Sequence, residues 1–144
     1  MKIKIKKVRD GAELPAYQTV GAAGFDFHAA IDTAVTLKPG QHRAFPTGVS
    51  VEIPAGYELQ IRPRSGLAYK YGVTMLNGVG TIDSDFRGEM NVMLVNFGDQ
   101  DFVVEPAMRI AQGVVERYEK VEWVETQELS ETERGAGGLG STGK

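Results

Sequence analysis

Two carboxylates two residues apart, Asp83 and Asp85, are the first candidates for chemistry in this sequence. In such a pair one carboxylate can activate a water molecule as a general base, while the other has a structural role, for example beside Arg87. On a strand, residues two apart point to the same face, so both would face one site. An acidic turn between strands is the simpler interpretation of this D-x-D pattern. A calcium loop is excluded, because Gly88 and Met90 stand where oxygen ligands are needed.

Arg64, Ser65 and Gly66 form a second group, which is suited to binding an anion. The guanidinium of Arg64 can bind a phosphate through two hydrogen bonds, the hydroxyl of Ser65 is a donor, and no side chain obstructs the amide of Gly66. A structural turn with a surface arginine is the alternative. Asp26 is a third carboxylate, preceded by small residues that allow close backbone packing, and it is suited to hold Mg²⁺ through water.

The C-terminal residues 135–144 hold five of the chain's eighteen glycines, directly after Arg134. Such a segment is either a disordered tail or a phosphate clamp. In a clamp, the backbone amides converge on an anion, and Arg134, Ser141 and Thr142 add further donors. The partners elsewhere in the chain decide between the two interpretations, and the group around Arg64 is such a partner.

Residue types and spacing exclude several other sites. Gly135 and Gly140 have the spacing of a P-loop, but Ser141 stands where that loop needs lysine. No strand-glycine-helix unit of a dinucleotide-binding fold is present. His28 and His42 lack the spacing of a metal pair, so we expect packing or surface roles for them. The absence of cysteine excludes disulfides, thiolate metal sites and cysteine nucleophiles.

Composition predicts one globular domain to position these groups. The chain has 144 residues, 42% hydrophobic and 24% charged, which is enough for a single core. The net charge of −3 disfavours a nucleic-acid partner, and the lysines of residues 2–7 alternate with isoleucines as in an amphipathic strand. No apolar stretch has the length of a signal peptide or a membrane span, so we expect a cytoplasmic protein without a membrane partner.

Period-two patterning predicts an all-β fold of short strands, either a barrel or a jelly-roll-like sandwich. Apolar and polar residues alternate in residues 49–53 and 57–61. Apolar runs follow at residues 90–97, 102–104 and 110–115. Turns are predicted at residues 38–40 and 54–56, and one short helix at residues 65–71. Acidic residues dominate from residue 125 onward, so we predict a β-domain over residues 1–126 and a flexible arm over residues 127–144.

Five segments of the chain resemble, in order and spacing, the five motifs of the trimeric deoxyuridine triphosphatases. The segments are Ala23-Gly24-Phe25-Asp26-Phe27, Pro63-Arg64-Ser65-Gly66-Leu67, residues 77–88 (Asn77-Gly78-Val79-Gly80-Thr81-Ile82-Asp83-Ser84-Asp85-Phe86-Arg87-Gly88), Arg109-Ile110-Ala111-Gln112 and residues 134–143. The resemblance spans nearly the whole chain. It implies a jelly-roll-like β-clip homotrimer with three active sites at subunit interfaces, where the arm of one subunit closes over a site built by the others.

The resemblance also implies the reaction, which is hydrolysis of dUTP to dUMP and diphosphate. Mg²⁺ would bridge the triphosphate oxygens while water attacks the α-phosphorus. Asp83 is similar to the residue that activates this water, Gln112 would help to hold it, and Asp26 would hold metal-bound waters. The phosphate donors would be Arg64, Ser65, Gly66, Arg134, Gly138, Gly140, Ser141 and Thr142.

The same resemblance implies that Asn77 recognises uracil. Asn77 lies in a hairpin predicted over residues 73–82, which would also bring Gly80, Thr81 and Ile82 to the substrate. An unpaired or mispaired buried polar group costs about 1–3 kcal/mol, enough to reject cytosine. Two residues depart from the family pattern. Phe86 replaces a tyrosine beneath the deoxyribose, and Leu139 replaces the arm residue that stacks on uracil; a leucine can cover the base but cannot stack on it.

Two other functions remain as alternatives. A dCTP deaminase of the same superfamily would need a catalytic glutamate near the base, and the glycine-rich arm favours phosphate cleavage instead. A non-catalytic nucleotide-binding module would need Asp83 or the phosphate-binding arginines to be idle, and no residue pattern indicates this.

Overall fold

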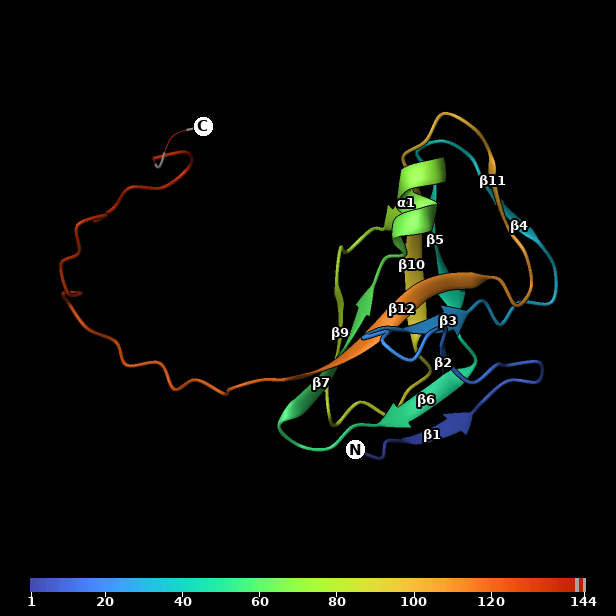
Figure 1. The fold of residues 1–144 in the computed structure, drawn as a ribbon, viewed down its shortest axis with the longest axis horizontal. Coiled ribbons are helices and arrows are strands. Elements are labelled where there is room, and N and C mark those ends of the chain that lie inside the picture. The colour runs from blue at the N-terminus through green and yellow to red at the C-terminus, as the bar shows by residue number, and fades with distance from the viewer. Residues whose placement is uncertain (142, 144) are drawn as a thin grey trace.

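The computed structural model describes residues 1–141 and 143 of the chain, and the regular secondary structure in these residues consists of short strands and one helix (Figure 1). The elements are β1 (Lys4–Lys7), β2 (Ala16–Tyr17), β3 (Phe25–His28), β4 (Val35–Leu37), β5 (His42–Pro46), β6 (Val49–Glu52), β7 (Tyr57–Arg62), α1 (Ser65–Tyr71), β8 (Val73–Met75), β9 (Gly80–Ile82), β10 (Asn91–Asn96), β11 (Phe102–Val104) and β12 (Arg109–Arg117). The predicted all-β class is confirmed. The strands form four antiparallel sheets rather than one closed barrel.

The largest sheet has five strands in the order β2-β3-β12-β7-β9, and it positions most of the candidate residues. Leu59 and Ile61 on β7 are buried in the core, while Glu58, Gln60 and Arg62 alternate with them on the opposite face. Burying a large apolar side chain contributes roughly 1.5–3 kcal/mol, and a register slip by one residue would expose both. The core therefore fixes which side chains of this sheet reach the polar face.

A second sheet, in the order β5-β10-β8, supplies the facing side of the core. Phe45, Val92 and Leu94 of this sheet are almost completely buried, and they belong to the same hydrophobic cluster as Leu59 and Ile61. The two sheets are thus held together by side chains from strands far apart in the sequence.

The predicted helix is confirmed as α1, which follows directly after β7. Leu67 is its buried residue and anchors the helix to the core. Gly72 ends the helix with a φ of 67°, in the left-handed region that favours glycine, and its amide donates to the carbonyl of Ala68 at 3.0 Å. The helix start, with Ser65 and Gly66, is therefore fixed at the end of a core strand.

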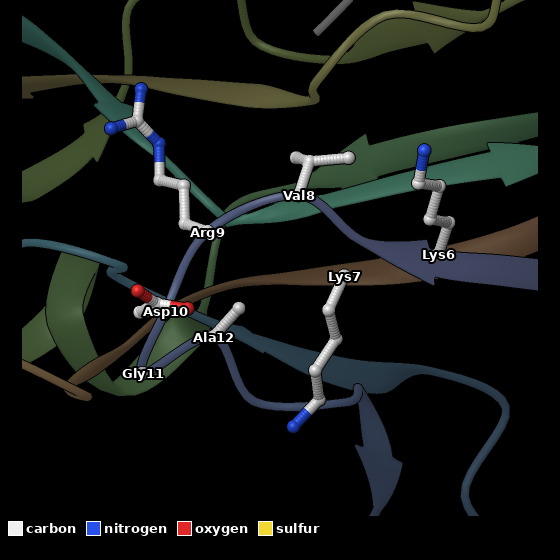
Figure 2. Close-up of a pocket in the computed structure, with 7 residues that line it drawn as sticks. All are labelled: Lys6, Lys7, Val8, Arg9, Asp10, Gly11 and Ala12. Carbon is white, nitrogen blue, oxygen red and sulfur yellow. The ribbon is translucent and has the colours of Figure 1, made fainter.

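The strand β1 leads into a turn over residues 8–12, which lines an open pocket (Figure 2). The side chains of Lys6 and Lys7 point to opposite sides of the strand. Arg9 donates a hydrogen bond from Nε to Oε1 of Glu89 at 2.6 Å, and this partner raises the pKa of the Arg9 guanidinium. Because the lysines diverge and Arg9 is paired, the pocket gathers no cationic cluster. The strand predicted over residues 2–7 is confirmed as β1, but all four residues of β1 are exposed, so β1 itself has no buried face.

The C-terminal segment follows β12, which ends at Arg117, and it is still held to the folded body at Tyr118, whose amide donates to the carbonyl of Gly56 at 3.2 Å. Residues 118–141 have no helix or strand, and the ribbon leads away from the sheets (Figure 1). Val121, Trp123 and Val124 are exposed by 67%, 90% and 82%. The domain boundary at residues 126 and 127 remains a prediction. Among the described residues, no helix is long and apolar enough to cross a membrane.

Candidate active site

The polar face of the five-stranded sheet brings candidate residues from three segments into one row. Gln112 on β12 lies opposite Asp26 on β3 and opposite Arg62 on β7. Thr81 on β9 lies opposite Gln60 at the next step along the same face. Since directly opposed residues of antiparallel strands point to the same side, the register alone places Asp26, Gln112 and Thr81 on one surface.

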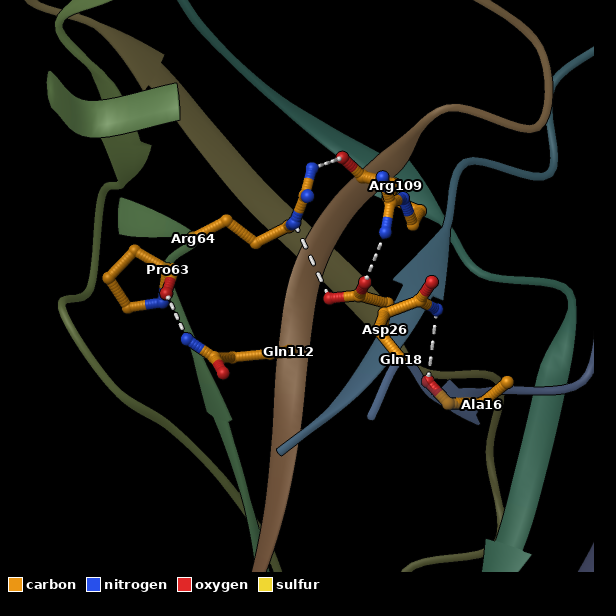
Figure 3. A network of polar contacts seen from close by, with 7 residues as sticks. All are labelled: Ala16, Gln18, Asp26, Pro63, Arg64, Arg109 and Gln112. Atoms are coloured by element: carbon orange, nitrogen blue, oxygen red, sulfur yellow. Dashed lines mark hydrogen bonds and ion pairs between the residues drawn. The ribbon is translucent and has the colours of Figure 1, made fainter. Parts of the chain in front are cut away.

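Asp26 is 8% exposed and lies between two arginines (Figure 3). Its Oδ2 accepts a hydrogen bond from Nη1 of Arg109 at 3.0 Å, and its Oδ1 lies 3.4 Å from Nε of Arg64. Nη1 of Arg64 also donates to the carbonyl oxygen of Arg109 at 2.8 Å. A buried carboxylate needs such partners, because taking a lone charge out of water is costly. The network fixes the guanidinium of Arg64 beside the sheet.

Gln112 is fixed by a bond to the segment that leads to α1. Its Nε2 donates to the carbonyl oxygen of Pro63 at 3.0 Å (Figure 3). On its other side lies Gly24, two residues before Asp26, where a Cβ atom would lie 3.3 Å from Cδ of Gln112. The carboxamide therefore has a defined place between β3 and the end of β7.

Ser65 and Gly66 form the exposed first turn of α1. The first amides of a helix have no partner within the helix, so they are available to an acceptor outside it. Arg64 is the residue before the helix, and its carbonyl accepts from the amides of Leu67 and Ala68, both at 3.1 Å. The three predicted anion donors of this segment are thus adjacent in space.

The prediction that residues 73–82 form a hairpin is wrong, because the two strands in this segment do not pair with each other. β8 pairs with β10, and β9 pairs with β7, so the two strands belong to different sheets. Asn77 lies exposed in the turn between them, where the amide of Gly78 donates to the carbonyl of Met75 at 3.1 Å. The side-chain nitrogen of Asn77 lies close to Gly80, since a Cβ atom there would be 3.2 Å from it.

Asp83 and Asp85 do not share the face of a strand, because β9 ends at Ile82. Both lie in a turn, in which the amide of Phe86 donates to the carbonyl of Asp83 at 3.2 Å. The expected pairing of Arg87 with one of these carboxylates is also wrong. The Arg87 guanidinium instead donates to the carbonyls of Ser84 and Phe86, at 2.7 and 2.9 Å. Asp83 is exposed, and no bond among the described residues joins it to Gln112.

The described arm residues stay apart from the sheet, and their hydrogen bonds join them only to residues of the same C-terminal segment. Nε of Arg134 donates to the carbonyl of Gly137 at 2.9 Å, and the amide of Ser141 donates to the carbonyl of Gly138 at 2.9 Å. Leu139 is fully exposed and Gly140 has a φ of 89°. Thr142 lies outside the described residues. The structure therefore does not bring the arm candidates together with Arg64 or Gln112 of the same chain.

In the described structure neither histidine is bonded to Asp26, Arg64 or Gln112, although His28 lies opposite Arg109 across β3 and β12. His28 is on β3, with Nε2 3.5 Å from Oε2 of Glu13, and His42 is exposed on β5. No group of three or more metal-ligating side chains occurs in the described part of the chain. The packing and surface roles expected for the histidines agree with these positions.

Three groups contribute to the site although residue types and spacing did not predict a role for them: Arg109, the carbonyl of Pro63, and Gly24. Arg109 stands at the start of the R-I-A-Q motif, and this position is the only signal that pointed to it. Its partner Asp26 is 83 residues away in the chain, so no local spacing predicts the ion pair. The other two act through the backbone, which residue types do not reveal.

The chain is similar to known proteins over nearly its whole length. A model of the dUTPase family matches residues 10–143. The deoxyuridine 5′-triphosphate nucleotidohydrolase of Nautilia profundicola is 55% identical over 144 residues, covering 100% of both chains, and that of Chlamydia pneumoniae is 58% identical over 134 residues, covering 92% of each. A structure of the Staphylococcus bacteriophage 80alpha dUTPase with dUpNHpp superposes with a TM-score of 0.91 at 24% identity, covering 99% of each chain. The dUTPase of phage phi11 of S. aureus, solved as a point mutant with a structural Mg(II) ion, gives 0.80 at 20% identity, covering 89% of this chain and 98% of that one.

Proposed function

This chain belongs to the dUTPase family, and on that premise we propose how its residues hydrolyse dUTP to dUMP and diphosphate. The family match over residues 10–143 is the observation that carries this function. Asp26 and Gln112 on one sheet face, with Arg64 paired to Asp26, support it, because cleavage of a phosphoanhydride needs cationic donors and an oriented water side by side. Removal of dUTP and supply of dUMP for thymidylate synthesis would take place in the cytoplasm.

Arg64, Ser65 and Gly66 bind the triphosphate in this proposal. The guanidinium of Arg64 is already oriented by Asp26 and by the carbonyl of Arg109, so it loses little freedom when it meets a phosphate. The hydroxyl of Ser65 and the free amides of the first helical turn add neutral donors. Donors fixed before the substrate arrives stabilise developing charge without reorganisation.

Asp26 is the group that would hold Mg²⁺, through water. Among the described residues Asp26 belongs to no group of three or more metal-ligating side chains, which fits this ion, because Mg²⁺ keeps several waters and binds mainly through substrate phosphates. Each Asp26 oxygen faces one guanidinium and retains a second lone pair that can accept from a metal-bound water. The bound ion would neutralise charge on the triphosphate.

Asp83 and Gln112 orient the attacking water. A carboxylate that takes a proton from this water contributes about 10²–10⁴-fold to the rate. The carboxamide of Gln112, fixed by Pro63, would hold the water through its oxygen or its second N–H group. Because Asp83 and Gln112 share no bond within one chain, we propose that they meet across a subunit interface.

Asn77 and the following strand recognise the nucleoside. The amide of Asn77 and the backbone of Gly80, Thr81 and Ile82 pair with the uracil edge, and Phe86 packs beneath the deoxyribose. Phe86 is 41% exposed, so its ring is free to contact a sugar. A ring of this size leaves no room for a ribose 2′-hydroxyl, which gives preference for dUTP over UTP.

The arm closes over the site of another subunit in a homotrimer. The course of residues 118–141 away from their own sheets supports this arrangement (Figure 1). An apolar groove beside β1 and β2, lined by Ile3, Ile5 and Tyr17 among others, supports association of subunits as well. Arg134, Gly138, Leu139, Gly140, Ser141 and Thr142 would then contact the bound nucleotide.

One assay tests the proposal. Diphosphate release is measured with dUTP, dCTP, dTTP and UTP, with and without Mg²⁺, together with ammonia release from dCTP. We expect rapid Mg²⁺-dependent diphosphate release from dUTP and little from the other three. Ammonia release from dCTP would instead indicate a deaminase, and binding of dUTP without any product would indicate a nucleotide-binding module.

A further inference from the structure

Gly24 lies against the side chain of Gln112 more closely than any other residue type allows. A Cβ atom at Gly24 would overlap Oε1 of Gln112 and would lie 3.3 Å from Cδ and 3.6 Å from Cβ of that side chain. Gln112 lies opposite Asp26, and Gly24 is two residues before Asp26, so the contact is a diagonal one between β12 and the residue just before β3. The missing side chain thus creates the space that the carboxamide fills.

We propose that Gly24 is a positioning residue that sets the orientation of the Gln112 carboxamide. This inference rests on the proposed role of Gln112 in holding the attacking water. Only the nitrogen of the carboxamide can donate to the Pro63 carbonyl, at 3.0 Å, so Oε1 must lie on the side of Gly24. With both ends fixed, Oε1 and the second N–H group keep defined directions for a water and a phosphate oxygen.

The contact between Gly24 and Gln112 affects the geometry of the site rather than the stability of the fold. Gly24 has no positive φ, so alanine can adopt its backbone conformation without strain. The atom that a new methyl group would meet first is the end of a long side chain, which can rotate away. Gly113 is the contrast, since a Cβ atom there would lie 2.6 Å from the rings of both Phe25 and Phe27. Substitution of Gly113 would disturb the core, whereas substitution of Gly24 displaces Gln112 alone.

A double-mutant cycle tests the inference with Gly24→Ala, Gln112→Ala and the double variant in the full-length protein. We expect Gly24→Ala to lower kcat for dUTP by about 10–100-fold, because a displacement near 1 Å at a reacting group costs this much, with KM and Tm almost unchanged. In the Gln112→Ala background the same substitution should have less than about a threefold effect, since the side chain it displaces is gone.

Gly21→Ala is the matched control, because a Cβ atom there meets nothing within 4 Å and its φ is not positive. Its kcat should equal that of the wild type. If Gln112→Ala is slow but Gly24→Ala is as fast as the wild type, the positioning role is overturned and the proposed function stands. Equal losses from Gly24→Ala in both backgrounds also overturn it, since the methyl group then acts elsewhere. A wild-type kcat for Gln112→Ala overturns the role of Gln112 and the inference together.

Discussion

The residues on the five-stranded sheet and the residues of the C-terminal arm differ in what fixes them. Asp26 is bonded to Arg64 and Arg109, and Gln112 is bonded to the carbonyl of Pro63, in each case between segments far apart in the sequence. Within the described part of the chain, Arg134 bonds only to its near neighbour Gly137. The first group is therefore preorganised before substrate binds, whereas the arm must gain its order from a nucleotide or another subunit. Substitutions that break the ion pairs of Asp26 should change stability and activity together, and substitutions in the arm should change activity alone.

The largest effect is expected at Asp83, which lies in a turn directly after a sheet strand. Asp83→Asn keeps the shape of the side chain but cannot take a proton, so we expect kcat for diphosphate release to fall by roughly 10²–10⁴-fold. Titration with a non-hydrolysable dUTP analogue should show nearly unchanged affinity. A variant that turns over at the wild-type rate would remove Asp83 from the chemistry.

Truncation after Glu133 tests the prediction for the C-terminal arm. It removes Arg134 and the glycine-rich segment, and loss of even one charge-stabilising donor costs about 10²–10³-fold in kcat. We expect that size of loss in the diphosphate assay with the same Tm, because the arm makes no bond to the sheets among the described residues. A large drop in Tm would contradict the separation of the two regions, and unchanged kinetics would make the segment a disordered tail.

Arg109→Ala is expected to lower both stability and activity, and its effect on kcat should be smaller than that of the truncation. Asp26 would keep Arg64 but lose its closer partner, leaving part of a buried charge uncompensated, at a cost of about 1–2 kcal/mol. Thermal unfolding should show a Tm lower by roughly 3–8 °C, and kcat should fall about tenfold as Arg64 loses its orientation. Arg43→Ala is the control, since Arg43 is exposed and has no ion pair within the described part of the chain. Equal effects of both substitutions would argue against the network.

Leu139→Phe gives the smallest expected effect. An aromatic face that stacks on uracil adds about 0.5–1.5 kcal/mol beyond its buried area, which is a tightening of roughly two- to tenfold for the analogue. Leu129→Phe is a matched control, because Leu129 is also strongly exposed on the same segment but lies outside the glycine-rich motif. Weaker binding by Leu139→Phe would exclude a covering role for this position.

The sequence predicts the strands and the helix of this fold better than it predicts which strands pair with each other. Alternation of buried and exposed residues is a local signal, so strands such as β7 and the helix α1 could be predicted from it. Pairing is not local, and for this reason the hairpin predicted from β8 and β9 is wrong. The ion pair of Asp26 with Arg109 and the contact of Gly24 with Gln112 likewise depend on the register of β3 and β12, which spacing along the chain does not contain.

The course of the arm has a consequence for how strongly its motif must bind. The segment over residues 118–133, without helix or strand, can span roughly 50 Å when extended, so it keeps the glycine-rich end near a neighbouring site at an effective concentration in the millimolar range. A weak contact then suffices for closure, which makes the replacement of a stacking ring by Leu139 tolerable. The same arm supplied as a free peptide to the truncated protein would have to reach millimolar concentration before it restored activity.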